Sequence, residues 1–254
     1  MDKIVNHPDY LADDARHEAP GESALRRALR VKLWHPLLNF TRPARHSLGL
    51  RQNNAKNLND KSDVYRDWAD RQFAAPSPHF VKQEVLLRTG LRDAIWVETG
   101  TYTGDTTSVL SKVAKMVYSI EPEPALFSKA EQKFRNTRNV KIIRGLSEEV
   151  LPKLLPTLSG DVCFWLDGHF SGGITFKGPQ ETPILDELDA IGRNITRMGR
   201  VHVLVDDIRL FDPTNPQFFA YPSIDFVVDW ARKHNFAWHI EHDIFIAKIT
   251  KSAK

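Results

Sequence analysis

IWVETGTYTGD, the segment at residues 95–105, carries the clearest structural signal in this chain. An apolar run leads into Glu98, a turn with two glycines follows, and a helix-like segment begins at Thr106. The order of strand, tight turn and helix start is typical of a ligand site at the edge of a parallel sheet. Glycine permits the sharp turn and lets the backbone approach a ligand closely. We therefore predict a nucleotide-like ligand at this turn, with a plain glycine-rich loop as the alternative.

A second carboxylate follows the next apolar run, at residues 116–120. This residue, Glu121, lies about twenty residues beyond the turn, the spacing expected for an acid that takes ribose hydroxyls. The turn reads Glu-x-Gly-x-Tyr-x-Gly and not Gly-x-Gly-x-x-Gly, so it matches a pyrophosphate cradle poorly. A carboxylate at the strand end repels phosphate and suits a cationic ligand.

These residues resemble the first two motifs of the class I S-adenosylmethionine-dependent methyltransferases, and the resemblance covers about Phe80 to Ile249. In that family the first motif surrounds the methionine part of the cofactor, and the second acid holds its ribose. Tyr102 stands where the family usually has glycine, and an aromatic residue there resembles the catechol and macrocin O-methyltransferase branches. The resemblance implies that S-adenosylmethionine is bound by residues after the first four strands, namely Glu98, Gly100, Thr101, Tyr102, Gly104, Glu121, Ser147 and Asp167.

Strand and helix patterns alternate from residue 78 onward, as a doubly wound sheet requires. The strand runs are continuously apolar, which fits burial on both faces. Two final strand-like runs follow almost without a gap, so we predict an antiparallel hairpin. The result is a Rossmann-like α/β fold with seven strands, at 94–99, 116–121, 140–144, 162–167, 201–206, 236–241 and 244–249. Helices are expected between them at 105–113, 124–135, 147–155, 182–198 and 223–233.

The composition of the 254-residue chain is that of a globular protein, with a formal net charge of +3. The single cysteine, Cys163, excludes an internal disulfide framework and fits a reducing cytosol. It lies in a strand-like apolar run, so we interpret it as a buried small residue and not as a nucleophile. No apolar run approaches the roughly 20 residues that span a bilayer, and the N-terminus has no signal-peptide core. These features predict a cytoplasmic protein.

Residues 1–62 are expected to form a partly helical extension before a methyltransferase domain at 63–254. Residues 22–40 have the apolar spacing of an amphipathic helix. Between Ser23 and Arg51 the charged side chains, histidine aside, are all basic. Such a segment can lie on an anionic surface, here the inner face of the membrane. The alternative is a helix that docks on its own domain or on a second copy of the chain.

Carboxylates follow the fourth and fifth predicted strands, at Asp167 and at the pair Asp206 and Asp207. Neighbouring parallel strands end at one edge of a sheet, so we expect the three carboxylates to converge. Carboxylates that close repel each other, and a hard divalent ion such as Mg²⁺ relieves the repulsion. In the alternative, Asp167 lines the cofactor pocket without a metal, and Asp206 or Asp207 caps a turn.

The resemblance to macrocin-type sugar O-methyltransferases favours the metal. In those enzymes one Asp after the fourth strand and an Asp pair after the fifth hold it, and they correspond to Asp167, Asp206 and Asp207. His169 stands where those enzymes carry an acidic candidate base. Histidine has an ordinary pKa of about 6.5, which suits proton removal at neutral pH. We therefore predict His169 and Asp167 as catalytic residues, with an orienting or core role as the alternative for His169.

Three further features surround this edge. Ser147 begins the predicted helix after the third strand, where the family has a residue that contacts adenine, and the residues alone favour a helix N-cap. The segment from Phe170 to Thr182 is long and contains several glycines, so it is a candidate substrate lid. The segment from Phe211 to Pro222 is rich in aromatic residues and is a candidate wall of an acceptor pocket.

The sequence thus predicts an S-adenosylmethionine-dependent O-methyltransferase, assisted by Mg²⁺, that methylates a sugar hydroxyl of a glycan, a glycolipid or a glycosylated metabolite. A small-molecule phenol or catechol is the alternative acceptor. A non-catalytic, Rossmann-like partner-binding module is the alternative from another class. A nucleic-acid acceptor is not expected, because the domain has neither an Asn-Pro-Pro-aromatic motif nor a dense basic stripe.

Overall fold

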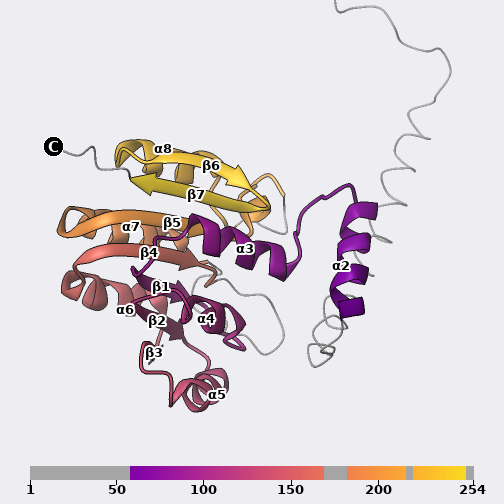
Figure 1. Cartoon of the computed structure of the whole chain (residues 1–254). Coiled ribbons are helices and arrows are strands. Elements are labelled where there is room, and N and C mark those ends of the chain that lie inside the picture. Colours follow the sequence, from indigo (N-terminus) through magenta and orange to yellow (C-terminus); the bar gives the residue numbers. More distant parts are fainter. Residues whose placement is uncertain (1–57, 169–181, 216–219, 250–254) are drawn as a thin grey trace, which may run out of the picture. The chain divides into compact units, whose positions relative to one another are not determined.

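The computed structural model describes residues 58–168, 182–215 and 220–249 (Figure 1). The chain divides into two units, Met1–Lys61 and Ser62–Lys254, and the following description concerns the second. The amphipathic helix predicted at 22–40, the candidate base His169 and most of the lid after Phe170 lie outside the described residues.

Seven strands in the described ranges form one sheet, in the order β3-β2-β1-β4-β5-β7-β6. The first five strands are parallel, and β7 pairs antiparallel with both β5 and β6. This confirms the predicted Rossmann-like sheet with a C-terminal antiparallel hairpin. The strands are β1 (Ile95–Thr99), β2 (Met116–Glu121), β3 (Val140–Arg144), β4 (Gly160–Leu166), β5 (Met198–Val205), β6 (Ala237–Glu241) and β7 (Ile244–Ile249).

Helices after α2 cover both faces of the sheet, and the two cores arise from alternation along each strand. In β1, Trp96 packs with residues of α3 and α4, whereas Val97 packs with residues of α6, α7 and α8. Figure 1 shows α3 and α4 on the near face and α6, α7 and α8 behind the sheet. The helices are α2 (Leu58–Asp70), α3 (His79–Thr89), α4 (Asp105–Leu110), α5 (Pro124–Phe134), α6 (Ser147–Leu154), α7 (Ile184–Asn194) and α8 (Ile224–Lys233).

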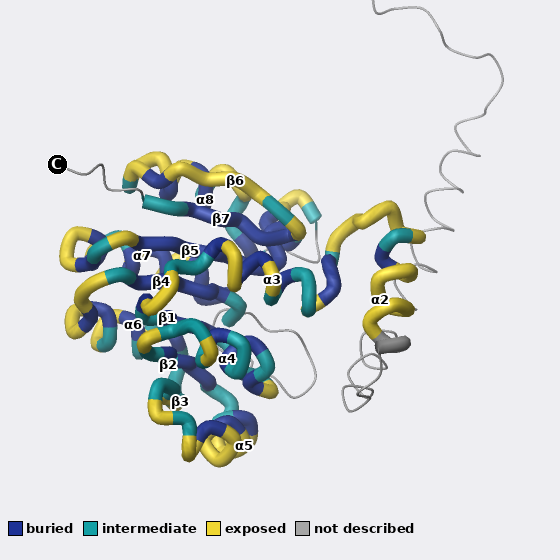
Figure 2. The backbone as a smooth tube through the Cα atoms, in the orientation of Figure 1, coloured by how far each residue is buried: buried dark blue, intermediate teal, exposed yellow. Residues whose placement is uncertain are grey.

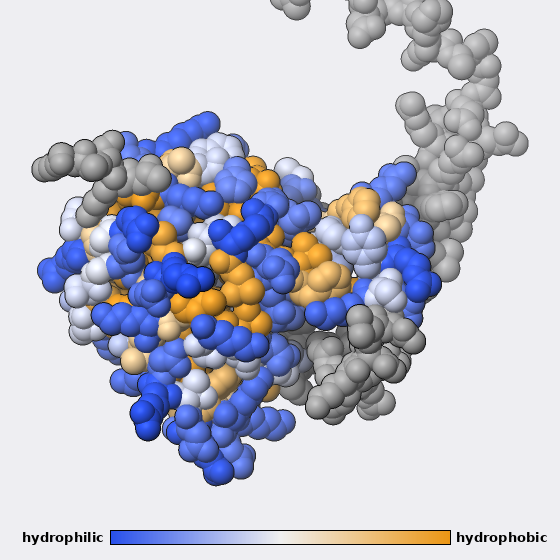
Figure 3. All heavy atoms as spheres, viewed as in Figure 1, coloured by the Kyte–Doolittle hydropathy of each residue, from blue (hydrophilic) through white to orange (hydrophobic). Residues whose placement is uncertain are grey.

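Burial follows the position of each strand in the sheet (Figure 2). The central strands β1, β4 and β5 are almost wholly buried, as their continuously apolar sequences predict. β6 forms one edge, and residues 237–240 are exposed. Figure 3 shows apolar residues among the polar ones on the face that carries α3, and the exposed side chains of the domain include Leu87, Trp238 and Ile240.

Cys163 is fully buried in β4, where burial raises the pKa of its thiol to about 12, so it is no nucleophile near neutral pH.

None of the helices in the described part of the chain combines the length and the apolar character that a bilayer crossing needs.

The topology places a ligand site at one edge of the sheet. The strand order reverses between β1 and β4, and in open α/β sheets ligands bind outside the carboxyl ends of the strands at this point. The ends of β1, β2, β4 and β5 carry the residues singled out in the sequence.

Candidate functional site

The glycine-rich turn after β1 has the backbone conformation that its sequence predicts. Gly100, Tyr102 and Gly104 have positive φ angles of 84°, 50° and 72°. A Cβ atom at Gly100 would lie 2.5 Å from the carbonyl oxygen of Asp167, at the end of β4. The turn can therefore approach β4 only because residue 100 lacks a side chain. Gly104 then serves as the N-cap of α4.

The carboxylate of Glu121 is held in position by the backbone of the glycine-rich turn that faces it. Its Oε2 accepts a hydrogen bond from the backbone N–H of Tyr102 at 2.8 Å, and its Oε1 accepts one from the N–H of Glu123 at 3.0 Å. Burial raises the pKa of this carboxyl, and the two backbone bonds oppose the rise. A carboxylate oxygen has two lone-pair directions, so both oxygens keep capacity for a further donor such as a ribose hydroxyl.

Glu98 lies beneath the turn and is fully buried. Its Oε2 accepts hydrogen bonds from the hydroxyls of Thr107 and Ser119. Its Oε1 is buried without a hydrogen-bond partner among the described residues. Burial raises the pKa of Glu98 to about 7, so its charge is poised near neutrality. Thr101, in the turn above, forms a hydrogen bond with Ser119, with 2.6 Å between the two hydroxyl oxygens.

Lys133, which no sequence pattern singled out, contacts this turn from α5. It lies in the last turn of α5, and its Nζ donates to the carbonyl oxygens of Thr103 and Gly104 at 2.9 and 3.0 Å. The same ammonium contacts Asp105 at 3.2 Å. Lys133 therefore ties the outer side of the glycine turn to α5.

The position of Ser147 in its helix differs from the predicted N-cap position. This serine is the first residue of α6, Leu146 occupies the N-cap position, and no side chain caps the helix. The predicted N-cap role is therefore wrong. Ser147 is buried at the end of β3, with its Oγ 3.5 Å from the Glu148 carboxylate. Its predicted contact with adenine stays a prediction.

The acid pair after β5 is bridged by a lysine from α3. The Nζ atom of Lys82 lies 2.6 Å from Oδ1 of Asp206 and 2.6 Å from Oδ1 of Asp207. All three residues are buried, with exposed fractions of 7–9%. Burial by itself lowers the pKa of Lys82, but the two carboxylates outweigh this effect and raise it. Lys82 is therefore a permanent cation of the site.

Arg209 and Asp243 extend this charge network. Arg209 Nη1 lies 2.6 Å from Oδ1 of Asp207 and also pairs with the carboxylate of Asp243. The backbone N–H of Arg209 donates to Asp243 Oδ1 at 2.9 Å. Asp243 belongs to the turn between β6 and β7 and is buried. The network thus ties the hairpin turn to the end of β5.

The structure does not assemble the predicted metal ligands. The part of the chain that is described contains no group of three or more His, Cys, Asp or Glu side chains placed to hold a metal. Asp206 and Asp207 lie against Lys82, so an ammonium relieves the repulsion that the sequence analysis assigned to Mg²⁺. Asp167 is half-buried after β4, where its backbone N–H donates to the carbonyl oxygen of Thr99 at 3.2 Å.

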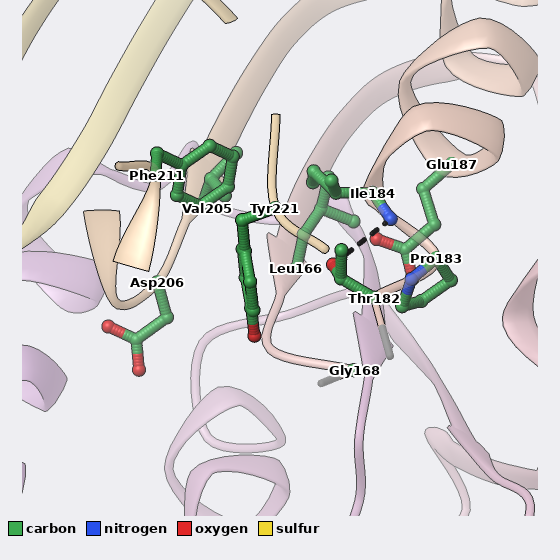
Figure 4. A pocket seen from close by; sticks show the side chains of 10 residues that line it. All are labelled: Leu166, Gly168, Thr182, Pro183, Ile184, Glu187, Val205, Asp206, Phe211 and Tyr221. Atoms are coloured by element: carbon green, nitrogen blue, oxygen red, sulfur yellow. Dashed lines mark hydrogen bonds between the residues drawn. The ribbon is translucent and has the colours of Figure 1, made fainter. Parts of the chain in front are cut away.

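A small pocket opens between the ends of β4 and β5, the start of α7 and the segment after β5 (Figure 4). Its walls combine apolar and polar surface, and the rings of Phe211 and Tyr221 meet edge-on with their centroids 5.4 Å apart. Figure 4 shows Asp206 on one side of Tyr221 and Glu187 on the other. The empty volume of the pocket is about 230 Å³, below the about 300–1,000 Å³ of most small-molecule sites. Its lining residues are Leu166, Gly168, Thr182, Pro183, Ile184, Glu187, Val205, Asp206, Phe211 and Tyr221.

One lining residue that was not expected is Glu187. Glu187 is 1% exposed in the first turn of α7. Acids are common in the first turn of a helix, so no sequence pattern set it apart. Phe211 and Tyr221 come from the segment that was predicted to border an acceptor pocket.

The sequence matches no family model and no curated protein. Several solved structures have a similar fold. A Streptococcus mutans protein assigned as a methyltransferase, in complex with SAH, shares 17% identity, covering 69% of this chain and 98% of its own, with a TM-score of 0.43. An rRNA methylase from Streptococcus thermophilus shares 15%, covering 69% of this chain and 96% of its own, with a TM-score of 0.41.

A precorrin-6y C5,15-methyltransferase from Geobacter metallireducens shares 14% identity, covering 68% of this chain and 88% of its own, with a TM-score of 0.42. At these values the likeness concerns the course of the chain and not its substrate. The function therefore rests on the residues of the site.

Proposed function

We propose that this chain is an S-adenosylmethionine-dependent O-methyltransferase. The observation that carries the proposal is the Glu121 carboxylate, buried at the end of β2 and held by the backbone N–H of Tyr102 in the glycine turn. The acid and the turn are thereby fixed relative to each other at the edge where ligands of this sheet type bind. A fixed acceptor for ribose hydroxyls beside a close backbone approach is what a nucleoside cofactor requires.

The residues fit the cofactor in charge as well as in shape. A Cβ atom at Gly100 would fill the space between this turn and the carbonyl oxygen of Asp167. Glycine keeps that space open. Glu98 and Glu121 place two carboxylates at this end of the sheet, which favours a cation and disfavours a phosphate. When bound, S-adenosylmethionine supplies a methyl group on a sulfonium, and the residues of this chain have to position the acceptor hydroxyl and remove its proton.

The acceptor in this proposal is a sugar hydroxyl. The pocket beside β4 and β5 combines aromatic walls with the carboxylates of Asp206 and Glu187, and carboxylates accept hydrogen bonds from hydroxyl groups. His169, two residues after Asp167, is the proposed proton acceptor. The apolar share of the same walls favours a phenol as the second candidate acceptor. No step is assigned to Mg²⁺, because Lys82 lies at the acid pair.

Calorimetry with S-adenosylmethionine and with SAH tests the cofactor site. Glu121→Ala removes a charged acceptor worth about 1.5–3 kcal/mol, so affinity is expected to fall roughly ten- to a hundredfold. Glu123→Ala is the matched control, because that neighbouring carboxylate is turned to its own helix and bonds the N–H of Ala125. Equal affinity in Glu121→Ala and wild type would contradict the assignment of this strand end.

A methyl-transfer screen with sugar and phenol acceptors then identifies the acceptor class. Wild-type protein that binds the cofactor and methylates a sugar hydroxyl would support the proposal. Transfer to phenols alone would replace the sugar by the second candidate. Cofactor binding without transfer to either class would favour a non-catalytic module.

A further inference from the structure

Lys82 belongs to the buried face of α3, and this fixes its ammonium at the end of β5. Its companions on that face are Val85, Leu86 and Thr89, at intervals of three and four residues. A surface lysine samples many rotamers, whereas the stem of Lys82 is enclosed by the domain. The ammonium of Lys82 therefore stays beside the acid pair.

The hydrogen bonds of the pair are complementary to this one cation. Asp206 Oδ1 accepts from Lys82 Nζ and from the backbone N–H of Asp207, both within 2.8 Å. Asp207 Oδ1 accepts from Lys82 and from Arg209, each at 2.6 Å. Asp207 itself has a left-handed backbone, with φ of 53°, and its carboxylate contacts Lys82 of α3. The pair is thus bonded by groups of this chain.

The ammonium also occupies the space that a metal would need. Divalent ions bind carboxylate oxygens at about 2.0–2.6 Å, and the Lys82 nitrogen lies 2.6 Å from one oxygen of each aspartate. A second cation at that place would meet the ammonium within contact distance, with like charges in a buried environment. Lysine and metal therefore exclude each other.

We propose that Lys82 is the built-in cation of this site. It takes the place of a divalent ion between Asp206 and Asp207, and it positions Asp206 at the wall of the acceptor pocket. The methyl transfer then proceeds without a metal. The statement about methyl transfer rests on the proposed function, whereas the exclusion of the metal concerns the acid pair alone.

Direct metal binding tests the exclusion without cofactor or acceptor. Mn²⁺ titration followed by electron paramagnetic resonance should show no specific site in the wild-type protein up to about millimolar ion, the range of weak oxygen-ligand sites for hard cations. Lys82→Met should gain a site at least about tenfold tighter than any binding by the wild type. Lys82→Met combined with Asp206→Asn should lose it again, and bound Mn²⁺ should raise the melting temperature of Lys82→Met alone.

Lys133→Met is the matched control for metal binding. Lys133 also pairs with an aspartate, Asp105, but both side chains are exposed, so its removal should create no Mn²⁺ site. Specific Mn²⁺ binding by the wild type that Asp206→Asn abolishes would overturn the proposal. So would a folded Lys82→Met protein that gains no binding. The wild-type titration decides the question even if the variant does not fold.

An activity arm separates this proposal from the proposed function. Once an acceptor is known, wild-type turnover should persist in excess chelator. Lys82→Met should lose turnover and regain part of it with Mn²⁺, an effect that a purely structural lysine would not produce. Loss of wild-type turnover in chelator would overturn the metal-free mechanism. Absence of methyl transfer with every acceptor would overturn the proposed function and leave the result of the Mn²⁺ titration standing.

Discussion

The two ends of the carboxyl edge hold buried carboxylates in different ways. At β1 and β2, Glu98 and Glu121 accept hydrogen bonds from hydroxyls and backbone N–H groups. At β5, Asp206 and Asp207 accept them from an ammonium and a guanidinium. Neutral donors stabilise a carboxylate without cancelling its charge, whereas a cation cancels it.

This difference indicates separate tasks for the two ends. Around Glu121, and around Glu98 where it is ionised, no cation of the described residues cancels the negative charge, so it can be balanced by a cationic cofactor. At β5 the three carboxylates of Asp206, Asp207 and Asp243 face two cations, so most of the charge is already balanced. The first end is suited to attract a ligand, and the second is suited to hold one hydroxyl-accepting group in place.

Removing one donor from each end should give the largest contrast. Arg209→Met leaves the buried Asp243 without its cation, which is expected to cost about 3–5 kcal/mol in the free energy of unfolding. Ser119→Ala removes a neutral hydroxyl from Glu98, which is expected to cost about 1–3 kcal/mol. Urea unfolding of the two variants measures both.

A second substitution checks the reason for this loss. Adding Asp243→Asn to Arg209→Met removes the charge left behind and should restore part of the stability. Equal costs for Arg209→Met and Ser119→Ala, with no recovery in the double variant, would mean that the two ends do not differ as described.

Gly100 lies where the two ends meet, and Gly160 provides a matched control. Both have φ of 84°, but a Cβ at Gly100 meets the Asp167 carbonyl oxygen at 2.5 Å, whereas a Cβ at Gly160 meets nothing within 4 Å. Gly160→Ala should cost about 1–2 kcal/mol for the left-handed backbone alone. Gly100→Ala should exceed it by about 1–3 kcal/mol, because the added methyl has to displace backbone. Thermal or urea unfolding compares the two, and similar costs would show that the turn can move away from β4.

The framework of the fold could be predicted because each strand is a continuous apolar run with a turn signal after it. β2 and β3 have the predicted bounds. β5 begins at Met198, before the predicted Val201, because the helix before it ends early, at Asn194, and a short 3₁₀ turn follows. Boundaries of this kind depend on packing, which local patterns do not contain.

The charge network could not be predicted, because its members are far apart in the sequence. Lys82 lies 125 residues before Asp207, and a lysine in a helix ordinarily faces solvent. The repulsion within the acid pair was evident from the sequence, but the cation that relieves it was not. The predicted N-cap role of Ser147 was wrong for a local reason. Leu146 occupies the N-cap position, so the helix begins one residue earlier than the polar side chain of Ser147 suggested.

The pH dependence of stability tests whether Glu98, at the β1 and β2 end, titrates near neutral pH. The folded pKa of Glu98 is about 7 against an ordinary value of 4.5, because burial disfavours the charged form. Its favourable contribution is therefore complete below about pH 4.5 and is lost as pH rises through about 7. Glu98→Gln stays neutral, so it should equal wild type in acid and exceed it by up to about 3 kcal/mol at pH 8, since each tenfold change in proton affinity is worth about 1.4 kcal/mol. Unfolding free energies of both proteins between pH 4 and 8 measure this, and a constant difference would show that Glu98 does not titrate there.

The smallest effect is expected for the cation at the β1 and β2 end. Lys133 lies at the surface, with 37% of its side chain exposed, and its pairing with Asp105 is screened by water and salt. Lys133→Met should therefore change the free energy of unfolding by less than about 1 kcal/mol, and the difference should shrink further in about 1 M salt. Lys82, enclosed with its two aspartates, has no such screening, so its effect should persist at high salt. If Lys133→Met costs as much as Lys82→Met, or if salt removes both effects alike, position at the edge and not burial governs how these lysines act, and the contrast between the two ends fails.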